Sequence, residues 1–141
     1  MAMSDVTLPP ETAEQFVSAC RAAIGDHLRA VVHFTPETTD VLYLRSDLRD
    51  HPEQVREERV DFVEYERVGF LSQEAYDRFA TKSDGTPDIG TYEFTIRVFS
   101  DGFVSRVIVG DHGVLLTTDS MNISDFEELS VTLRRLLANL E

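Results

Sequence analysis

Residues Tyr92 to Asp119 read YEFTIRVFS-DG-FVSRVIV-GDHG-VLLTTD and carry the strongest indication of the fold. Alternating apolar runs flank Asp101-Gly102, a dipeptide typical of type I′ hairpin turns because both central residues of that turn need positive φ. A third apolar run follows residues 110–113, which have the composition of a turn. The stretch therefore predicts three consecutive antiparallel strands.

The predicted hairpin sorts its residues into two faces, because side chains alternate along a strand. With Asp101 and Gly102 in the turn, Arg97 lies directly opposite Arg106. Like charges in that position cost up to about 1 kcal/mol, so we expect an anionic group to compensate them. The other face is expected to be a core face with Phe94, Ile96, Val98, Val107, Val109, Val114 and Leu116.

The face with the two arginines is a candidate binding site, because it mixes positive charge with apolar side chains. Its anionic partner can come from the carboxylates of the charged segment 51–66, or from an external anion or an acidic residue of another protein. The candidate interaction or anion site consists of Arg97, Phe99, Val104, Arg106 and Ile108.

Composition points to a globular chain with an acidic surface. The 141 residues are 42% hydrophobic, which is enough for one domain, expected over residues 11–141 after a flexible lead-in at residues 1–10. There are 26 acidic and 13 basic residues, a formal charge of −13, and Lys82 is the single lysine. This charge argues against binding to nucleic acid or to an anionic membrane surface.

Near-absence of lysine beside many carboxylates resembles the composition of proteins from salt-in halophiles. Their surfaces stay hydrated at molar salt, where the Debye length is about 3 Å. The alternative is an ordinary acidic protein from a GC-rich genome.

The sequence has no secretory signal and no stretch of about 18 apolar residues, and Cys20 is alone. We therefore expect a cytoplasmic protein.

The remaining periodicities complete an α+β order of α-β-β-α-α-β-β-β-α. Capping boxes mark two helix starts, and Gly, Pro, Asp and Ser mark the loops. The predicted elements are a helix from Glu11 to Gly25, strands at Leu28–Thr35 and Val41–Arg45, a charged helix at 51–66 capped by Asp50, a short helix at Ser72–Phe79, a mobile loop at Thr81–Gly90 and a helix from its cap Ser124 to the end.

No set of residues forms a catalytic, metal or cofactor signature. Cys20 lies on the apolar face of its helix and is interpreted as a buried structural thiol, and His33 as a partly exposed strand residue. Four dispersed histidines and one cysteine give no zinc spacing. A polar set near the last strand has turn-like composition and is only a weak catalytic candidate: Asp111, His112, Asp119 and Ser120.

The element order resembles that of roadblock/longin, profilin-like domains. This resemblance implies a five-stranded antiparallel sheet with the terminal helices on one face and the middle helical region on the other. At the residue level, LYLRSD ending at Asp47, FTIRVF around Ile96 and GVLLTTD ending at Asp119 resemble small acidic proteins of haloarchaea. The middle region is longer than a roadblock crossover requires.

These observations lead to three functional hypotheses. The first is a non-enzymatic interaction or regulatory module, as a homodimer, in a larger assembly or beside a GTPase-like partner. The alternative is a domain that senses an anionic small molecule through Arg97 and Arg106. The third is a small enzyme that uses the segment from Asp111 to Ser120. No cofactor and no metal are expected.

Overall fold

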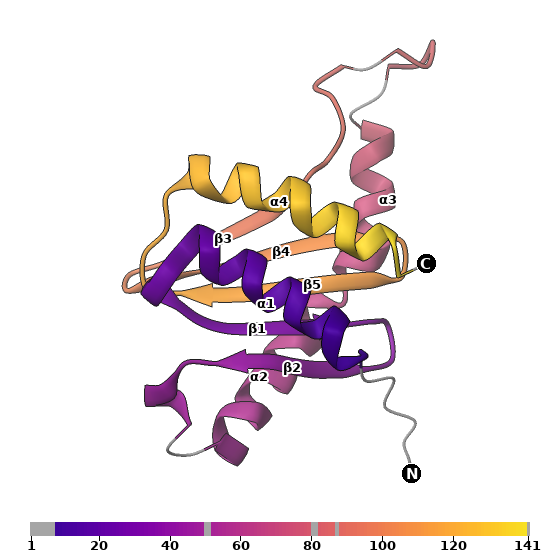
Figure 1. The fold of residues 1–141 in the computed structure, drawn as a ribbon. Coiled ribbons are helices and arrows are strands. Elements are labelled where there is room, and N and C mark those ends of the chain that lie inside the picture. The colour runs from indigo at the N-terminus through magenta and orange to yellow at the C-terminus, as the bar shows by residue number, and fades with distance from the viewer. Residues whose placement is uncertain (1–7, 50–51, 80–81, 87, 141) are drawn as a thin grey trace.

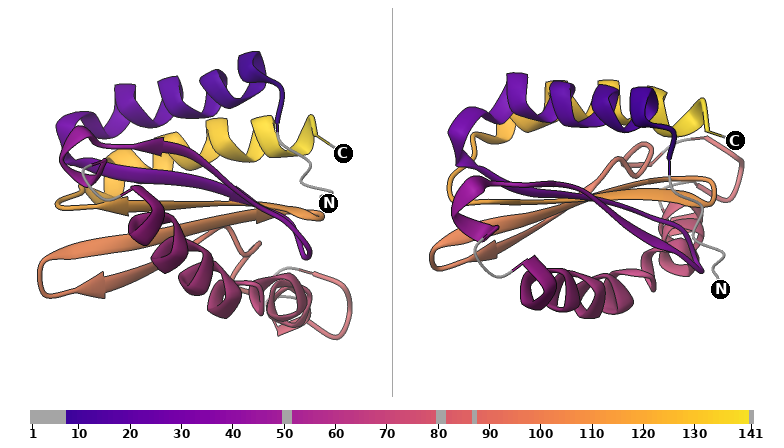
Figure 2. Two further views of the ribbon diagram at one scale, coloured as in Figure 1. Left: turned by 90° about the horizontal axis from the view of Figure 1, so that it is seen from below. Right: turned by 60° about the horizontal axis from the view of Figure 1, so that its bottom comes forward.

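The computed structural model describes residues 8–49, 52–79, 82–86 and 88–140, and the fold has three layers (Figures 1 and 2). A five-stranded sheet lies between two helical layers, one formed by the first and last helices and one by the two middle helices. The main elements are α1 Pro10–Ile24, β1 Leu28–Phe34, β2 Thr39–Leu44, α2 Pro52–Glu66, α3 Gly69–Phe79, β3 Thr95–Phe99, β4 Gly102–Val109, β5 His112–Thr118 and α4 Ile123–Ala138.

The sheet order is β2-β1-β5-β4-β3, and all neighbouring strands are antiparallel. The first hairpin therefore pairs with the last strand of the three-strand unit, and β2 and β3 form the two edges. This arrangement confirms the predicted five-stranded antiparallel sheet, its element order and the distribution of helices over its faces.

Each face of the sheet has its own hydrophobic core. Phe16 and Cys20 of α1 and Phe126 and Leu133 of α4 are fully buried against one face. Phe94 packs its ring edge-on against Phe126, with the ring centroids 4.9 Å apart. The smaller core beneath α2 and α3 contains Val32, Phe34, Val63, Val104, Ile108 and Leu115.

The register of the β3–β4 hairpin differs from the prediction. Phe99 pairs with Gly102, so Ser100 and Asp101 form the turn and Gly102 is the first residue of β4. Arg97 consequently pairs with Val104, and the prediction that it faces Arg106 directly was wrong. The pairing shifts by two residues, an even number, so the predicted assignment of residues to faces is unchanged.

A close backbone contact explains why glycine stands at position 102. A Cβ atom there would lie 2.5 Å from the carbonyl oxygen of Thr118 on the neighbouring strand. Glycine therefore permits β4 to approach the end of β5, rather than providing the positive φ that the turn signal suggested.

Several predicted boundaries and environments also need correction. The second middle helix begins at Gly69 rather than Ser72, and α4 is capped by Asn122, whose Oδ1 accepts a hydrogen bond from the Ser124 amide. Val98, predicted in the core, is 74% exposed, because β3 lies at the sheet edge. Predicted features at Asp50 and residues 1–7 lie outside the described residues, whereas Leu8 is buried.

We predict that Gly102→Ala lowers the free energy of unfolding by about 1–3 kcal/mol, because the new methyl group must displace the Thr118 backbone. Denaturant titration would measure the change. Ser100→Ala, in the adjacent exposed turn, is the control and should change stability by no more than about 0.5 kcal/mol. Equal stability of the two variants would contradict the packing argument.

Candidate functional site

The carboxylate of Glu66, the last residue of α2, binds both candidate arginines. Arg97 Nε donates to Oε2 at 2.7 Å, and Arg106 Nη1 donates to Oε1 at 2.8 Å. The hydrogen bond to Glu66 raises the pKa of Arg97 above its usual value. The charged helix therefore supplies the anionic partner, which is one of the two sources considered from the sequence.

Burial makes the Glu66–Arg106 pair important for the fold. Glu66 is 3% exposed and Arg106 is 4% exposed. Arg106 Nη2 also donates to the hydroxyl groups of Tyr92 and Thr95, both at 3.2 Å. These bonds satisfy the guanidinium at a position where an unpaired charge would be very costly.

The start of α3 lies directly on this cluster. A Cβ atom at Gly69 would lie 2.6 Å from Arg106 Cζ and 2.8 Å from Ile108 Cδ1. The preceding Arg67 donates from Nε to the carbonyl of Thr35 at 2.9 Å, and from Nη2 to the carbonyl of Thr38 at 2.7 Å. The junction of α2 and α3 is thus held to both hairpins of the sheet.

We predict that Glu66→Gln lowers the free energy of unfolding by about 3–5 kcal/mol, because Arg106 keeps a buried charge without a carboxylate. Equilibrium unfolding in urea at neutral pH would test this. The matched control is Glu64→Gln, two residues away, whose exposed carboxylate pairs with Arg67; its loss should cost no more than about 1 kcal/mol. Similar losses for both variants would exclude the proposed role of Glu66.

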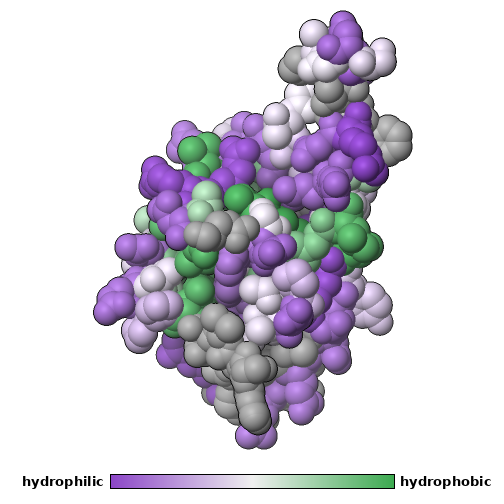
Figure 3. Space-filling model, turned by 90° about the vertical axis from the view of Figure 1, so that its right-hand side faces the viewer, coloured by the Kyte–Doolittle hydropathy of each residue, from purple (hydrophilic) through white to green (hydrophobic). Residues whose placement is uncertain are grey.

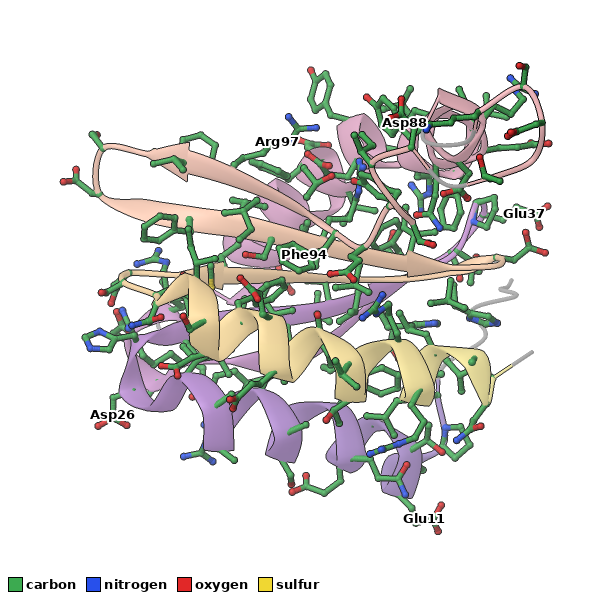
Figure 4. The ribbon with its side chains drawn as sticks, turned by 90° about the horizontal axis from the view of Figure 1, so that it is seen from above. Glu11, Asp26, Glu37, Asp88, Phe94 and Arg97 are labelled. Carbon is green, nitrogen blue, oxygen red and sulfur yellow. The ribbon has the colours of Figure 1, made fainter. Side chains whose placement is uncertain are left out.

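The structure divides the five predicted site residues between the core and the surface. Val104 and Ile108 are buried with Arg106 beneath α2 and α3, whereas Phe99 is 51% exposed. Arg97 lies at the exposed edge strand with its side chain directed toward the α2–α3 layer (Figure 4). Arg97 and Phe99 are therefore the members of the predicted site that reach the surface.

The surface around β3 combines an open strand edge with apolar side chains. Val98 and Phe99 are 74% and 51% exposed, and the Phe99 ring packs edge-on against Phe62 of α2. We call β3 and these three side chains the edge surface. Hydrophilic residues cover much of the end of the molecule seen in Figure 3, although hydrophobic patches interrupt them.

A second charged cluster joins the segment that ends at Asp47 to the segment that ends at Asp119. Asp119 binds both Arg45 and Arg29, and Arg45 also binds Asp47. Hydrogen bonds from Arg45 and then Arg29 lower the pKa of Asp119, and Arg45 lowers the pKa of Asp47. No sequence pattern indicated this cluster, which ties the end of β2 to both the start of β1 and the end of β5.

A histidine pair occupies the face beneath α1. His33 is fully buried, which corrects the expectation of partial exposure, and its Nε2 lies 2.9 Å from Nδ1 of His112. Burial, and then the charge of His112, lowers the pKa of His33 to about 4.

The β5 strand separates His112 from Asp119 and Ser120 by about 20 Å, so the weak catalytic set does not assemble.

We predict that acid destabilises the protein through His33. Its pKa is lower in the folded state, so the unfolded state binds more protons between about pH 6.5 and 4, and stability falls as pH decreases through this range, by up to about 3 kcal/mol. Urea titrations at pH 7, 5 and 4 would compare the wild type with His33→Phe, which should show a weaker pH dependence. His27→Gln, at an exposed histidine, should retain the wild-type dependence. An unchanged dependence in His33→Phe would contradict the prediction.

Other chemistry has little structural support in the described part of the chain. Burial raises the pKa of the Cys20 thiol to about 12, which agrees with a structural thiol. Among the described residues, no group of three or more His, Cys, Asp or Glu side chains could hold a metal ion. None of the described helices is both long enough and apolar enough to cross a membrane.

Comparison with solved structures identifies the class of fold. Myxococcus xanthus MglB, which has the roadblock/longin fold, aligns with a TM-score of 0.57 over 96% of this chain and 97% of its own. The two sequences are 8% identical, so the similarity concerns the fold alone. It confirms the roadblock-like architecture that the element order suggested.

Comparison with protein families gives the membership of the chain. The family described as "Domain of unknown function (DUF7522)" matches residues 14–138, and the chain belongs to this family. No curated protein matches the sequence at a significant level.

Proposed function

We propose that this protein is a non-enzymatic interaction or regulatory module that assembles through its edge surface, with a second copy of the same chain as the first partner. The observation that carries the proposal is the open β3 edge with exposed Val98 and Phe99. An edge strand presents unpaired backbone N–H and C=O groups, and exposed apolar side chains beside it favour association.

A second copy suits this edge for a geometric reason. Two identical edge strands related by a two-fold axis run antiparallel, so each can complete the hydrogen bonding of the other. The two five-stranded sheets would then become one continuous sheet. The similarity to MglB supports a roadblock-like module, although it does not by itself identify a partner.

The proposed environment is the cytoplasm of a halophile. A formal charge of −13 produces strong self-repulsion between two copies at low ionic strength. Molar salt shortens the range of this repulsion to about 3 Å and allows close approach. Association is therefore expected to strengthen with salt, opposite to the behaviour of a complex between oppositely charged proteins.

We predict that the wild type is dimeric in 2 M KCl and that the double variant Val98→Lys, Phe99→Ser is monomeric, because the changes remove apolar contacts and add charge at the edge. Sedimentation velocity over a range of protein concentrations would measure this. Val131→Lys is the control, because Val131 is 57% exposed on α4, outside the edge surface, and should leave the dimer intact.

Affinity capture from the native lysate at molar salt would test the wider proposal. Loss of a stoichiometric protein partner in the double variant would support the edge surface as the interface. A wild-type protein that remains monomeric, or a double variant that retains every association of the wild type, would refute it.

A further inference from the structure

A pocket opens between α2 and the end of the sheet at the β3–β4 hairpin. It has a volume of about 400 Å³ and contains none of the buried Glu66 cluster. Such a volume lies within the range of small-molecule sites in proteins. The residues that line it are Arg29, Phe62, Val104, Thr117, Thr118 and residues 99–103 of the hairpin.

The walls suit the flat apolar body of a ligand. Phe62 from α2 and Phe99 from β3 have ring centroids 6.4 Å apart at an interplanar angle of 61°. Val104 lies beside them in the second hydrophobic core. Aromatic rings prefer such edge-on or offset neighbours, so a planar aromatic group fits these walls better than a flexible polar chain does.

Arg29 is the one basic side chain among the residues that line this pocket. Its Nη1 donates to Asp119 Oδ1 at 3.1 Å, and the same carboxylate is shared with Arg45. The guanidinium is planar and has five N–H donors. One bond to Asp119 therefore leaves donors that can bind a carboxylate in a forked arrangement.

Thr117 adds a buried hydroxyl without a partner. Its residue is 7% exposed, and its Oγ1 forms no hydrogen bond in the structure. The three staggered χ1 rotamers of threonine place the hydroxyl in three different directions, and Thr117 is among the residues that line the pocket. A hydrogen-bond acceptor of a ligand would satisfy this group, which otherwise destabilises the free protein.

We propose that this pocket binds a small aromatic carboxylate, with the carboxylate on Arg29 and Thr117 and the ring on Phe62 and Phe99. The site differs from the predicted anion site, because Glu66 already occupies Arg97 and Arg106. Phe99 and Val104 are shared by the two sites, whereas the cation is Arg29. The pocket shares Phe62 and Phe99 with the edge surface, so sedimentation measures dimer formation separately from ligand binding.

Isothermal titration calorimetry in 2 M KCl would test the ligand class with 2-naphthoate, its uncharged amide and the corresponding naphthylmethylammonium ion. We expect saturable binding of 2-naphthoate and at least tenfold weaker binding of the amide. The ammonium compound tests whether Asp101, at the exposed tip of the hairpin, attracts a cation instead. Tighter binding of the amide or the cation than of the carboxylate would overturn the proposal.

Variants locate the binding on the residues of the pocket. Arg29→Gln should weaken 2-naphthoate binding about tenfold or more, corresponding to the loss of one charged hydrogen-bonded contact. Arg45→Gln is the matched control, because it removes the other ion pair of Asp119 without touching the pocket, and should retain wild-type affinity. Equal effects of the two variants would assign the loss to Asp119 and overturn the site.

Thr117→Val separates binding from stability. Replacing an unpartnered hydroxyl with a methyl group of similar shape should raise the Tm by a few degrees and weaken 2-naphthoate binding. A merely structural role of Thr117 would not produce these opposite changes. A stabilised variant with unchanged affinity would exclude the hydroxyl contact, and absence of saturable binding to the wild type would refute the pocket.

Discussion

The carboxylate of Glu66 is the constraint on which the α2–α3 side of the molecule depends. It pairs with both the buried Arg106 and the half-exposed Arg97, and thereby holds the end of α2 over β3 and β4. Arg67, the next residue, binds carbonyl groups of the β1–β2 turn. Two consecutive residues of opposite charge thus attach the helical layer to both halves of the sheet, and Gly69 allows the closest approach.

This attachment also determines which surfaces remain for function. The layer covers Val104, Arg106 and Ile108, so the mixed sheet face that the sequence suggested is mostly interior. Two features lie beyond the covered region: the open edge of β3 and the pocket beside Phe99. The first suits a protein partner because it offers backbone groups, whereas the second is a shallow, open hollow whose volume suits a small molecule.

Sequence reasoning succeeded where the physical cause was local. Alternation identified the strands and helical spacing identified the helices, whereas the anionic partner of the two arginines was left open between the charged helix and an external anion or another protein. It failed at the turn because Asp101-Gly102 fits a type I′ turn, while the requirement at Gly102 comes from Thr118, sixteen positions away in the chain. The Ser124 cap failed similarly, because Asn122 two residues earlier is an equally suitable cap.

The fold class, the order of the elements and the faces of the residues in the last three strands could be read from the sequence, because these follow from periodicity within short segments. Only the tertiary structure decided which residues meet: His33 with His112, Arg29 and Arg45 with Asp119, and Glu66 with both arginines. In every one of these contacts the two residues are at least 31 positions apart in the chain. Such pairing depends on how the strands are ordered in the sheet. No local pattern encodes that order, so the pocket beside Phe99 and the cluster around Asp119 became visible only when the strands and helices were placed together.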